Sequence, residues 1–338
     1  MAASAVIGAT FPSLVDFYRR TDPDGAISKV VEYLAKLTPL IGDAPVREGN
    51  LPDGYKFTLR QTLPTVGKRR FNEGVAPTKS TTNQITEPVT MLNAQSIVDE
   101  QEANLNGNGP AFRASEDMAF MSAFSQSGES STLYDNKGTD PSTFSGFLTR
   151  LASTTTALFG KQIVKWGSGG SNTNASMLLV GWGEETVHLM FPKGSKGGIE
   201  HKDMGQQLID PSNNGKRFVG LVSDWTWKLG LVIKDPRFVA AVRNIDMSTI
   251  SGGTVGSPVN DLIMAAIDAY HRIFQPGLVN LVWYVPRKLS TYLHQQAVNS
   301  ISKSTLTYEE VAGKPVIKLL GVPVKIADQM TTTEAAIS

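Results

Sequence analysis

The sequence predicts a mixed α+β fold, and three observations lead to this prediction. Apolar residues recur at helical spacing over residues 26–37 and 260–274, which is typical of amphipathic helices. Apolar and polar residues alternate from Tyr55 to Arg60, which is the period of a strand. Towards the C-terminus, a buried-looking strand (LVNLVWYVP) precedes a helix over about residues 287–298 and a hairpin-like run (VAGKPVIKLLGVPVKIAD).

The first forty residues are predicted to contain one amphipathic helix. It follows the turn-forming run DPDG, covers residues 26–37 and ends near Pro39. Its apolar positions are Ile27, Val30, Val31, Leu34 and Leu37. The N-terminal run has no basic region before its short apolar part, and no window approaches the ~18 apolar residues that cross a bilayer. We therefore expect neither a signal peptide nor a membrane span.

Residues 61–90 are rich in Thr, Lys, Arg and Pro and poor in bulky apolar residues. Clustered Thr and alternating Val and Ile favour strands. We therefore predict a long hairpin with roughly 12 to 15 residues per arm, which at about 3.3 Å per residue reaches ~40 to 50 Å from the body. Such a hairpin is only marginally stable alone and is expected to rest on another subunit. A disordered surface loop is the alternative interpretation.

Two further helices are expected in the middle of the chain. Residues 94–105 have helical spacing, the run NGNGP interrupts them, and residues 111–124 resume with Pro110 suitably placed in the first turn. One side of the second helix carries residues that we assign to the core: Phe112, Met118, Ala119, Met121 and Phe124. Residues 125–175 are rich in Ser, Thr, Gly and Asn and are predicted to form loops with a short helix.

The block from Gly181 to Asp246 has the clearest pattern. Two runs that contain tryptophan, GWGEETVHLMF and SDWTWKLGLVIKDPRFVAAVRNID, predict long strands on either side of a Lys- and Gly-rich loop, PKGSKGGIEHKDMG. Trp225 and Trp227 alternate, so both face the same side of one strand, where packing is favoured over stacking on bases. The run SGGTVGSP that follows indicates a boundary.

The composition limits the chemistry open to the chain. Its 338 residues include 32 basic and 31 acidic side chains, so no global charge draws the protein to nucleic acid or to an anionic membrane. The sequence has no cysteine, which excludes disulfides, thiolate catalysis and thiolate zinc sites and fits a reducing cytoplasm.

Motifs for catalysis or ligand binding are weak. The loop around Lys193 lacks the GxxxxGKS/T spacing of a P-loop, and no GxSxG motif is present. His201 and Asp203 alone are too few for a metal site, and paired acids such as Glu184 and Glu185 are common on strand surfaces. No two histidines are three or four positions apart among His188, His201, His271 and His294. We therefore predict no catalytic, cofactor-binding or metal-binding residue and no enzymatic activity.

Six cations are candidates for contact with another subunit: Lys68, Arg69, Arg70, Lys193, Lys196 and Lys202. The first three form a compact basic cluster on the predicted hairpin, where they either face solvent or meet an acidic surface of a neighbour. The other three belong to the Gly-rich loop, whose glycines permit tight turns and whose lysines are solvated or touch a neighbour.

Three segments together resemble a known family: FPKGSKGGIEHKDMG, DWTWKLGLVIKDPRFVAAVRNID and GKPVIKLLGVPVKIADQM. They are similar to the major capsid protein of tailed bacteriophages, in particular the epsilon-fifteen-like short-tailed group. The resemblance implies the Hong Kong 97-type capsid fold. Because the long strands precede the axial domain, the topologically permuted variant of that fold is expected. The implied parts are an N-terminal arm (1–45), an E-loop hairpin (46–92), a P-domain with spine helix and long strands (93–256) and an A-domain (257–338).

The resemblance also implies a function. Copies of the chain would assemble into rings of five and six, and the rings into an icosahedral shell around double-stranded DNA, with each E-loop lying over an adjacent subunit. A separate scaffolding protein and a portal are expected partners, and a decoration protein is a further candidate. Neither sequence-specific DNA binding nor a membrane is involved. The implied location is the virion capsid, after assembly in the bacterial host cytoplasm.

Two alternatives and one chemical question remain open at this point. An encapsulin-like compartment shares the fold but encloses protein cargo, and a β-rich hydrolase belongs to a different class. Some related shells are crosslinked between lysine and asparagine. Lys56, Lys68 and Lys79 lie on the predicted hairpin, but the sequence identifies no partner or catalytic acid, so no crosslink is expected.

Overall fold

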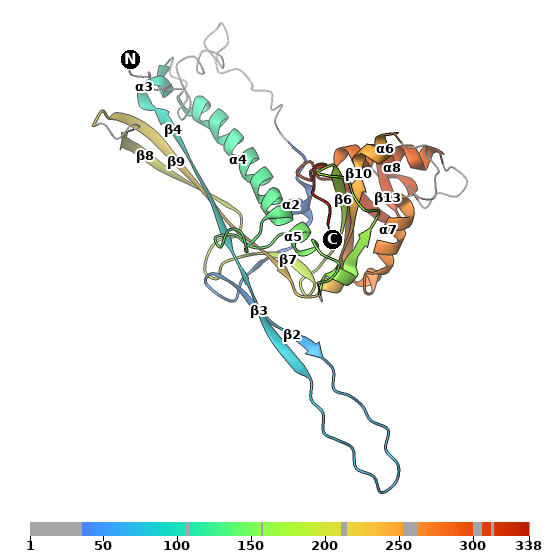
Figure 1. Cartoon of the computed structure of the whole chain (residues 1–338). Coiled ribbons are helices and arrows are strands. Elements are labelled where there is room, and N and C mark those ends of the chain that lie inside the picture. The colour runs from blue at the N-terminus through green and yellow to red at the C-terminus, as the bar shows by residue number, and fades with distance from the viewer. Residues whose placement is uncertain are drawn as a thin grey trace.

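The computed structural model of the chain describes residues 36–105, 109–156, 158–210, 215–252, 262–299, 306–311 and 314–337. The predicted N-terminal helix over residues 26–37 lies outside these ranges apart from its last two residues. Figure 1 shows a body of sheet and helices from which two extensions leave in different directions. One extension is a long arm of helix and sheet, and the other is a thin β-hairpin.

The described residues contain both helices and strands, mostly in consecutive runs of one kind, which confirms the α+β class. The helices are α2 (Pro39–Asp43), α3 (Glu100–Ala103), α4 (Gly109–Tyr134), α5 (Phe147–Arg150), α6 (Met247–Gly252), α7 (Leu262–His271) and α8 (Arg287–Asn299), with 3₁₀ turns η3 (Gly160–Gln162), η4 (Pro236–Phe238) and η6 (Pro276–Leu278). The strands are β1 (Val46–Glu48), β2 (Gly54–Thr62), β3 (Thr81–Pro88), β4 (Thr90–Asp99), β5 (Ile163–Lys165), β6 (Asn174–Trp182), β7 (Val187–Phe191), β8 (Ile199–Ile209), β9 (Phe218–Ile233), β10 (Val239–Asp246), β11 (Asn280–Val285), β12 (Leu306–Val311), β13 (Lys314–Leu319) and β14 (Val322–Ile326). Of the helices in the described ranges, none is long and apolar enough to cross a membrane.

The body is built around β6, which is buried at every residue. Its sequence, NASMLLVGW, is nearly continuous in apolar residues, as expected of a strand covered on both faces. β6 pairs antiparallel with β10 and with β11, and β11 pairs parallel with β14. The strand, helix and hairpin predicted near the C-terminus are confirmed by β11, α8 and the antiparallel pair of β13 and β14.

The long strand β9 joins the body to the arm. Its C-terminal end pairs with β7, and the rest lies between β4 and β8, antiparallel to both. α4 lies along this three-stranded sheet (Figure 1). Trp225 and Trp227 are buried in the hydrophobic core that the sheet and α4 share, which confirms the packing role predicted for them.

The prediction of a helix over residues 94–105 is wrong for its first half. β4 continues to Asp99, and only the short α3 follows, capped where the Asp99 carboxylate accepts a hydrogen bond of 2.8 Å from the Gln101 N–H. Every residue of β4 is paired with β9, so this long-range ladder outweighs the local helix signal. The second predicted helix is confirmed, but α4 extends to Tyr134, into the stretch predicted to be loops. Packing against the sheet outweighs the low helix propensity of its Ser and Gly residues.

The assignment of one side of α4 to the core is only half right. Phe112 and Phe124 are 0% and 4% exposed, whereas Met118 and Met121 are 61% and 51% exposed. Ala119 is exposed as well. The phenylalanines pack under α4, and the methionines lie on the side of the helix that this subunit leaves uncovered.

Candidate functional site

The Lys- and Gly-rich block that suggested ligand chemistry forms a turn followed by strand β8, and not one loop. His201 stacks on Trp225 with ring centroids 4.2 Å apart, and the Asp203 carboxylate pairs with the Arg113 guanidinium of α4 at 2.9 Å. That hydrogen bond is the main reason why the pKa of Asp203 is lowered. Within the described residues, no group of three or more His, Cys, Asp or Glu is placed to hold a metal ion. The two residues instead fasten β8 to the arm.

The turn between β7 and β8 uses its backbone within the chain. The Lys193 N–H donates to the Leu51 carbonyl at 3.2 Å, and the Gly194 N–H donates to the Glu48 carboxylate at 2.8 Å. A phosphate-binding turn needs amides that point freely at the ligand. Here two amides tie the turn to the segment that leads into the hairpin.

The hairpin of β2 and β3 is paired from Gly54↔Pro88 to Thr62↔Thr81. The Thr62 and Thr81 hydroxyls share a hydrogen bond of 2.6 Å at the last rung. Beyond it, residues 63–80 form an open loop without strand pairing (Figure 1). The paired strands are therefore shorter than the roughly 12 to 15 residues per arm predicted at strand geometry. Proline and glycine in the loop explain this, because proline has no N–H for a ladder and glycine disfavours strands.

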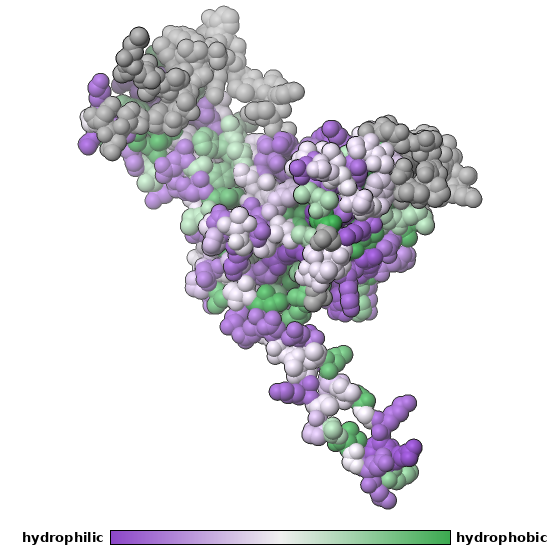
Figure 2. Space-filling view, in the orientation of Figure 1, coloured by the Kyte–Doolittle hydropathy of each residue, from purple (hydrophilic) through white to green (hydrophobic). Residues whose placement is uncertain are grey.

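The hairpin tip combines exposed apolar and basic side chains. Figure 2 shows hydrophobic and hydrophilic residues interspersed along this part of the hairpin. Phe71 is 97% exposed and Val66 is 92% exposed. Lys68, Arg69 and Arg70 are exposed between them. A buried phenylalanine contributes about 1.5–3 kcal/mol relative to an exposed one. The projecting tip, which leaves Phe71 in water, is therefore a candidate surface for contact with another molecule.

The six candidate cations lie in three separate places. The cluster 68–70 is at the hairpin tip, whereas Lys193 and Lys196 are in the turn beside the hairpin base. Lys202 is on β8, opposite Asp224 of β9 in the strand register. The structure does not bring these three places together, and of the six cations only Lys68, Arg69 and Arg70 lie on the hairpin.

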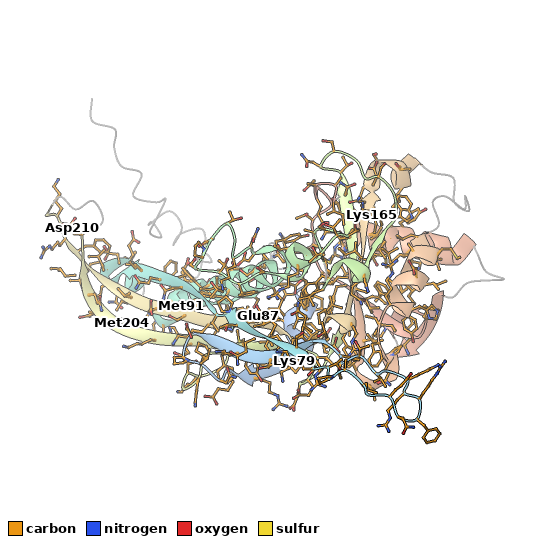
Figure 3. All side chains as sticks on the ribbon, turned by 60° about the horizontal axis from the view of Figure 1, so that its bottom comes forward. Lys79, Glu87, Met91, Lys165, Met204 and Asp210 are labelled. Carbon is orange, nitrogen blue, oxygen red and sulfur yellow. The ribbon has the colours of Figure 1, made fainter. Side chains whose placement is uncertain are left out.

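Sequence reasoning missed the residues that hold the hairpin base, the region where Figure 3 labels Glu87. The Arg150 guanidinium of α5 donates two hydrogen bonds of 2.7 Å to the Glu87 carboxylate of β3. On β2, Tyr55 packs edge-on against His188, with ring centroids 5.7 Å apart. The Asn50 side chain bonds the backbone of β2 through hydrogen bonds of 2.6 and 2.7 Å. One signal was available: Glu87 falls on the inward side of the alternating pattern in β3.

Two buried groups titrate far from their ordinary range. Burial, together with the smaller effect of the nearby Lys234 cation, lowers the pKa of His188 to about 4. Burial also raises the pKa of Glu129 in α4 to about 8, although its carboxylate accepts a hydrogen bond of 3.2 Å from the Leu40 N–H. Burial is the first cause of both shifts. The two pKa shifts reflect close packing around His188 at the hairpin base and around Glu129, where α4 contacts α2.

The solvent side of α4 is a second candidate contact surface. We call Met118, Met121 and the exposed alanines beside them the α4 stripe. Acidic residues Glu116 and Asp117 adjoin it, and Asp117 is half-buried, which raises the pKa of its carboxyl. Methionine is flexible and polarisable and suits surfaces that adapt to a partner. The α4 stripe is thus apolar with an acidic margin, whereas the hairpin tip is apolar with a basic cluster.

Comparison with known proteins gives a strong likeness to phage capsid proteins. A family model described as major capsid protein GP7 matches residues 22–338. A chain from the structure of bacteriophage epsilon15 is 31% identical, with a TM-score of 0.80, and the match covers 99% of each chain. The bacteriophage JBD30 capsid is more distant, at 9% identity and a TM-score of 0.48 over 90% of this chain and 96% of that one. The holo-SrpI encapsulin complex from Synechococcus elongatus gives 10% identity and 0.43 over 65% and 93%. No curated protein matches the sequence.

Proposed function

The chain belongs to the major capsid protein GP7 family, and we propose that its copies assemble through the β2–β3 hairpin into the icosahedral shell of a tailed bacteriophage. The observation that carries the hairpin's role is the tip, where Phe71 and the cluster 68–70 are left exposed by their own subunit. A shell subunit buries such a surface on its neighbour. A protein that works alone would gain nothing from it.

Assembly by this route requires two different contact surfaces on each subunit: the hairpin tip, which contacts one neighbour, and a second surface, which the hairpin tip of another neighbour contacts. Head-to-tail contacts of this kind close into rings when the rotation between subunits closes, and we propose rings of five and six. Each contact is modest, and many contacts together hold the shell because the geometry engages them simultaneously.

The α4 stripe is the receiving surface that the charges favour. The hairpin tip carries Lys68, Arg69 and Arg70, and the margin of the stripe carries Glu116 and Asp117. Apolar side chains are exposed on both surfaces. The hairpin leaves the body away from its own α4 (Figure 1), so the stripe it meets belongs to a second subunit. Complementary charge would then fix the register of the contact more than its affinity.

The parts of the Hong Kong 97-type fold can be assigned on the same basis. We assign residues 1–45 to the N-terminal arm, 46–92 to the E-loop, 93–256 to the P-domain and 257–338 to the A-domain. α4 is then the spine helix, and β4, β8 and β9 are the long P-domain strands. The order of these parts along the chain supports the permuted variant.

The proposed role also defines partners and place. A capsid protein resides in the virion capsid, and we propose that this one assembles in the host cytoplasm with a separate scaffolding protein and a portal. A decoration protein is a further candidate partner. The shell would enclose double-stranded DNA without reading its sequence, which suits the balanced charge of 32 basic and 31 acidic residues. The role needs no catalysis, cofactor, crosslink or membrane. The family match favours the phage shell over an encapsulin-like compartment or a β-rich hydrolase.

Electron microscopy of the expressed chain tests this function. The full chain is expressed in bacteria alone and together with the phage's other head proteins. We expect closed icosahedral particles in at least one case, and a persistent monomer in both would contradict the proposal. Phe71→Ala is expected to reduce particle yield without changing monomer stability. Leu278→Ala is the matched control, because Leu278 is 73% exposed but lies outside the hairpin.

A further inference from the structure

The ion pair between Glu87 and Arg150 has a fixed geometry. The two guanidinium nitrogens Nη1 and Nη2 donate to the two carboxylate oxygens at 2.7 Å each, in parallel. The third donor, Arg150 Nε, is bonded to the Ser145 carbonyl at 2.8 Å. Both side chains are nearly enclosed: that of Arg150 is 12% exposed and that of Glu87 is 8% exposed. Because Nη1 and Nη2 are bonded to Glu87 and Nε is bonded to Ser145, the guanidinium group of Arg150 is held in one orientation.

The pair lies where the hairpin leaves the body. Glu87 is the cross-strand partner of Tyr55, one rung from the start of the ladder. Tyr55 is held in turn by the edge contact with His188 and by Lys234, whose Nζ is 5.4 Å from the Tyr55 ring centroid. At the first rung, a Cβ on Gly54 would fall 2.2 Å from the Glu87 carbonyl oxygen, so the strands there have no room for a side chain. Both strands are therefore fixed within one rung.

Stability alone does not account for an ion pair at this position. Taking two charges out of water costs about as much as their attraction returns, and well-packed apolar residues of similar volume are often equally stabilising or better. What a bidentate pair adds is direction, because its two parallel hydrogen bonds tolerate little rotation.

The direction in which the hairpin leaves the body matters, because a small tilt at its base produces a large displacement at its far end. The nine residues of β2 span roughly 30 Å at about 3.3 Å per residue, so a tilt of about 10° at the base moves the far end by ~5 Å. The open loop of residues 63–80 starts from that end, so its starting point would move by the same distance, which exceeds the length of a hydrogen bond or ion pair.

We propose that Arg150 is a positioning residue for assembly. Its two hydrogen bonds to Glu87 set the direction in which the hairpin leaves the body, and this direction places the tip on the neighbouring subunit. Arg150 itself lies at the base and acts through β3. The proposal rests on the shell function proposed above, since only an assembling protein has a neighbour to reach.

Two variants separate positioning from stability. In Glu87→Met with Arg150→Met, the charges are replaced by apolar side chains of comparable volume, so the melting temperature is expected to stay close to that of the unaltered chain. Arg150→Lys keeps the charge but cannot form the fork. For both we expect about tenfold fewer closed shells than for the unaltered chain, with a broader spread of particle diameters, because misdirected tips close wrong rings. The readouts are the melting temperature of the subunit and particle counts and diameters by electron microscopy.

Asp268→Asn is the matched control, because it removes the carboxylate that pairs at 2.9 Å with Arg272, just after the end of α7, and leaves the hairpin untouched. It should assemble like the unaltered chain. If Arg150→Lys and the double methionine variant fold and also give shells of unaltered number and diameter, Arg150 has no positioning role. If the double variant does not fold, Arg150→Lys alone decides, since its charge is retained. Failure of the unaltered chain to form shells would contradict the proposed function instead.

Discussion

Trp227 of β9 lies so close to Gly128 of α4 that a Cβ at position 128 would fall 2.1 Å from the indole Cζ3 atom. The helix backbone and the indole ring are in direct contact, which fixes the distance between α4 and the sheet of the arm. A glycine in the middle of a helix is normally unfavourable by about 1 kcal/mol relative to alanine. Here the packing on Trp227 requires it.

Gly128→Ala is therefore expected to destabilise the subunit, although alanine is the better helix former. The added methyl group must displace either α4 or the indole, and such overpacking costs about 1–3 kcal/mol. Thermal unfolding measures the loss. Gly42→Ala in α2 is the control, because a Cβ built there meets nothing within 4 Å apart from its chain neighbours and the backbone of its own helix turn. It should leave the melting temperature unchanged or raise it. Equal melting temperatures for the two variants would contradict the contact.

Glu129→Gln is expected to change how stability depends on pH. The Glu129 carboxyl has a pKa of about 8 in the folded chain against an ordinary value of 4.5, so the folded state holds the proton more tightly. Its contribution to stability is complete below about pH 4.5 and is lost as the pH rises to about 8. Glutamine mimics the protonated form. Melting temperatures at pH 5 and pH 8.5 should therefore differ less for the variant, and an unchanged difference would argue against a buried neutral Glu129.

His188→Phe should make the subunit less sensitive to acid. The folded pKa of His188, about 4, lies below its ordinary 6.5, so the unfolded chain binds the proton more readily. Stability is complete above about pH 6.5 and is lost as the pH falls towards 4. Phenylalanine keeps an aromatic ring against Tyr55 and cannot be protonated. The fall in melting temperature between pH 7 and pH 4.5 should shrink in this variant but not in His271→Gln, which changes an exposed histidine.

Met118→Lys should block assembly and leave the isolated subunit intact. Met118 is 61% exposed, so its replacement is expected to change the free energy of unfolding by no more than about 0.5 kcal/mol. At the proposed contact, however, the new cation would face Lys68, Arg69 and Arg70 of the neighbouring hairpin tip. Met264→Lys is the matched control, since Met264 is also 61% exposed but lies on α7. Normal shell yield from Met118→Lys would show that the hairpin docks elsewhere.

Elements with a strong period of their own could be predicted from the sequence. The alternation around Trp225 and Trp227 indicates β9, and the continuous apolar run NLVWYV indicates β11. In both cases the burial of the strand sets which positions of its own sequence are apolar. β4 was mistaken for a helix, since its partner β9 lies more than a hundred residues away and its C-terminal end runs into the helix-forming residues of α3. Long-range pairing of this kind leaves no local period.

The candidate site was predictable only in part. The cluster 68–70 stood out because adjacent cations are visible in any sequence. The base of the hairpin did not, because Glu87 and Arg150 are 63 positions apart and each looks ordinary in its own segment. The exposure of Met118 was equally hidden, since an apolar side of a helix has the same spacing whether its own subunit or another covers it.

The open loop of residues 63–80 has a consequence for how assembly proceeds. Its backbone takes no part in strand pairing within its subunit, so ordering it on a neighbour carries an entropic cost of about 1–2 kcal/mol for each residue that becomes fixed. At the proposed contact, that cost would offset much of what Phe71 and the basic cluster gain, so a single docked tip would dissociate readily. Reversible first contacts let a misplaced subunit leave before the ring closes. In the proposed assembly, the open loop would therefore act as a proofreading element, because weak early contacts would allow errors to be corrected.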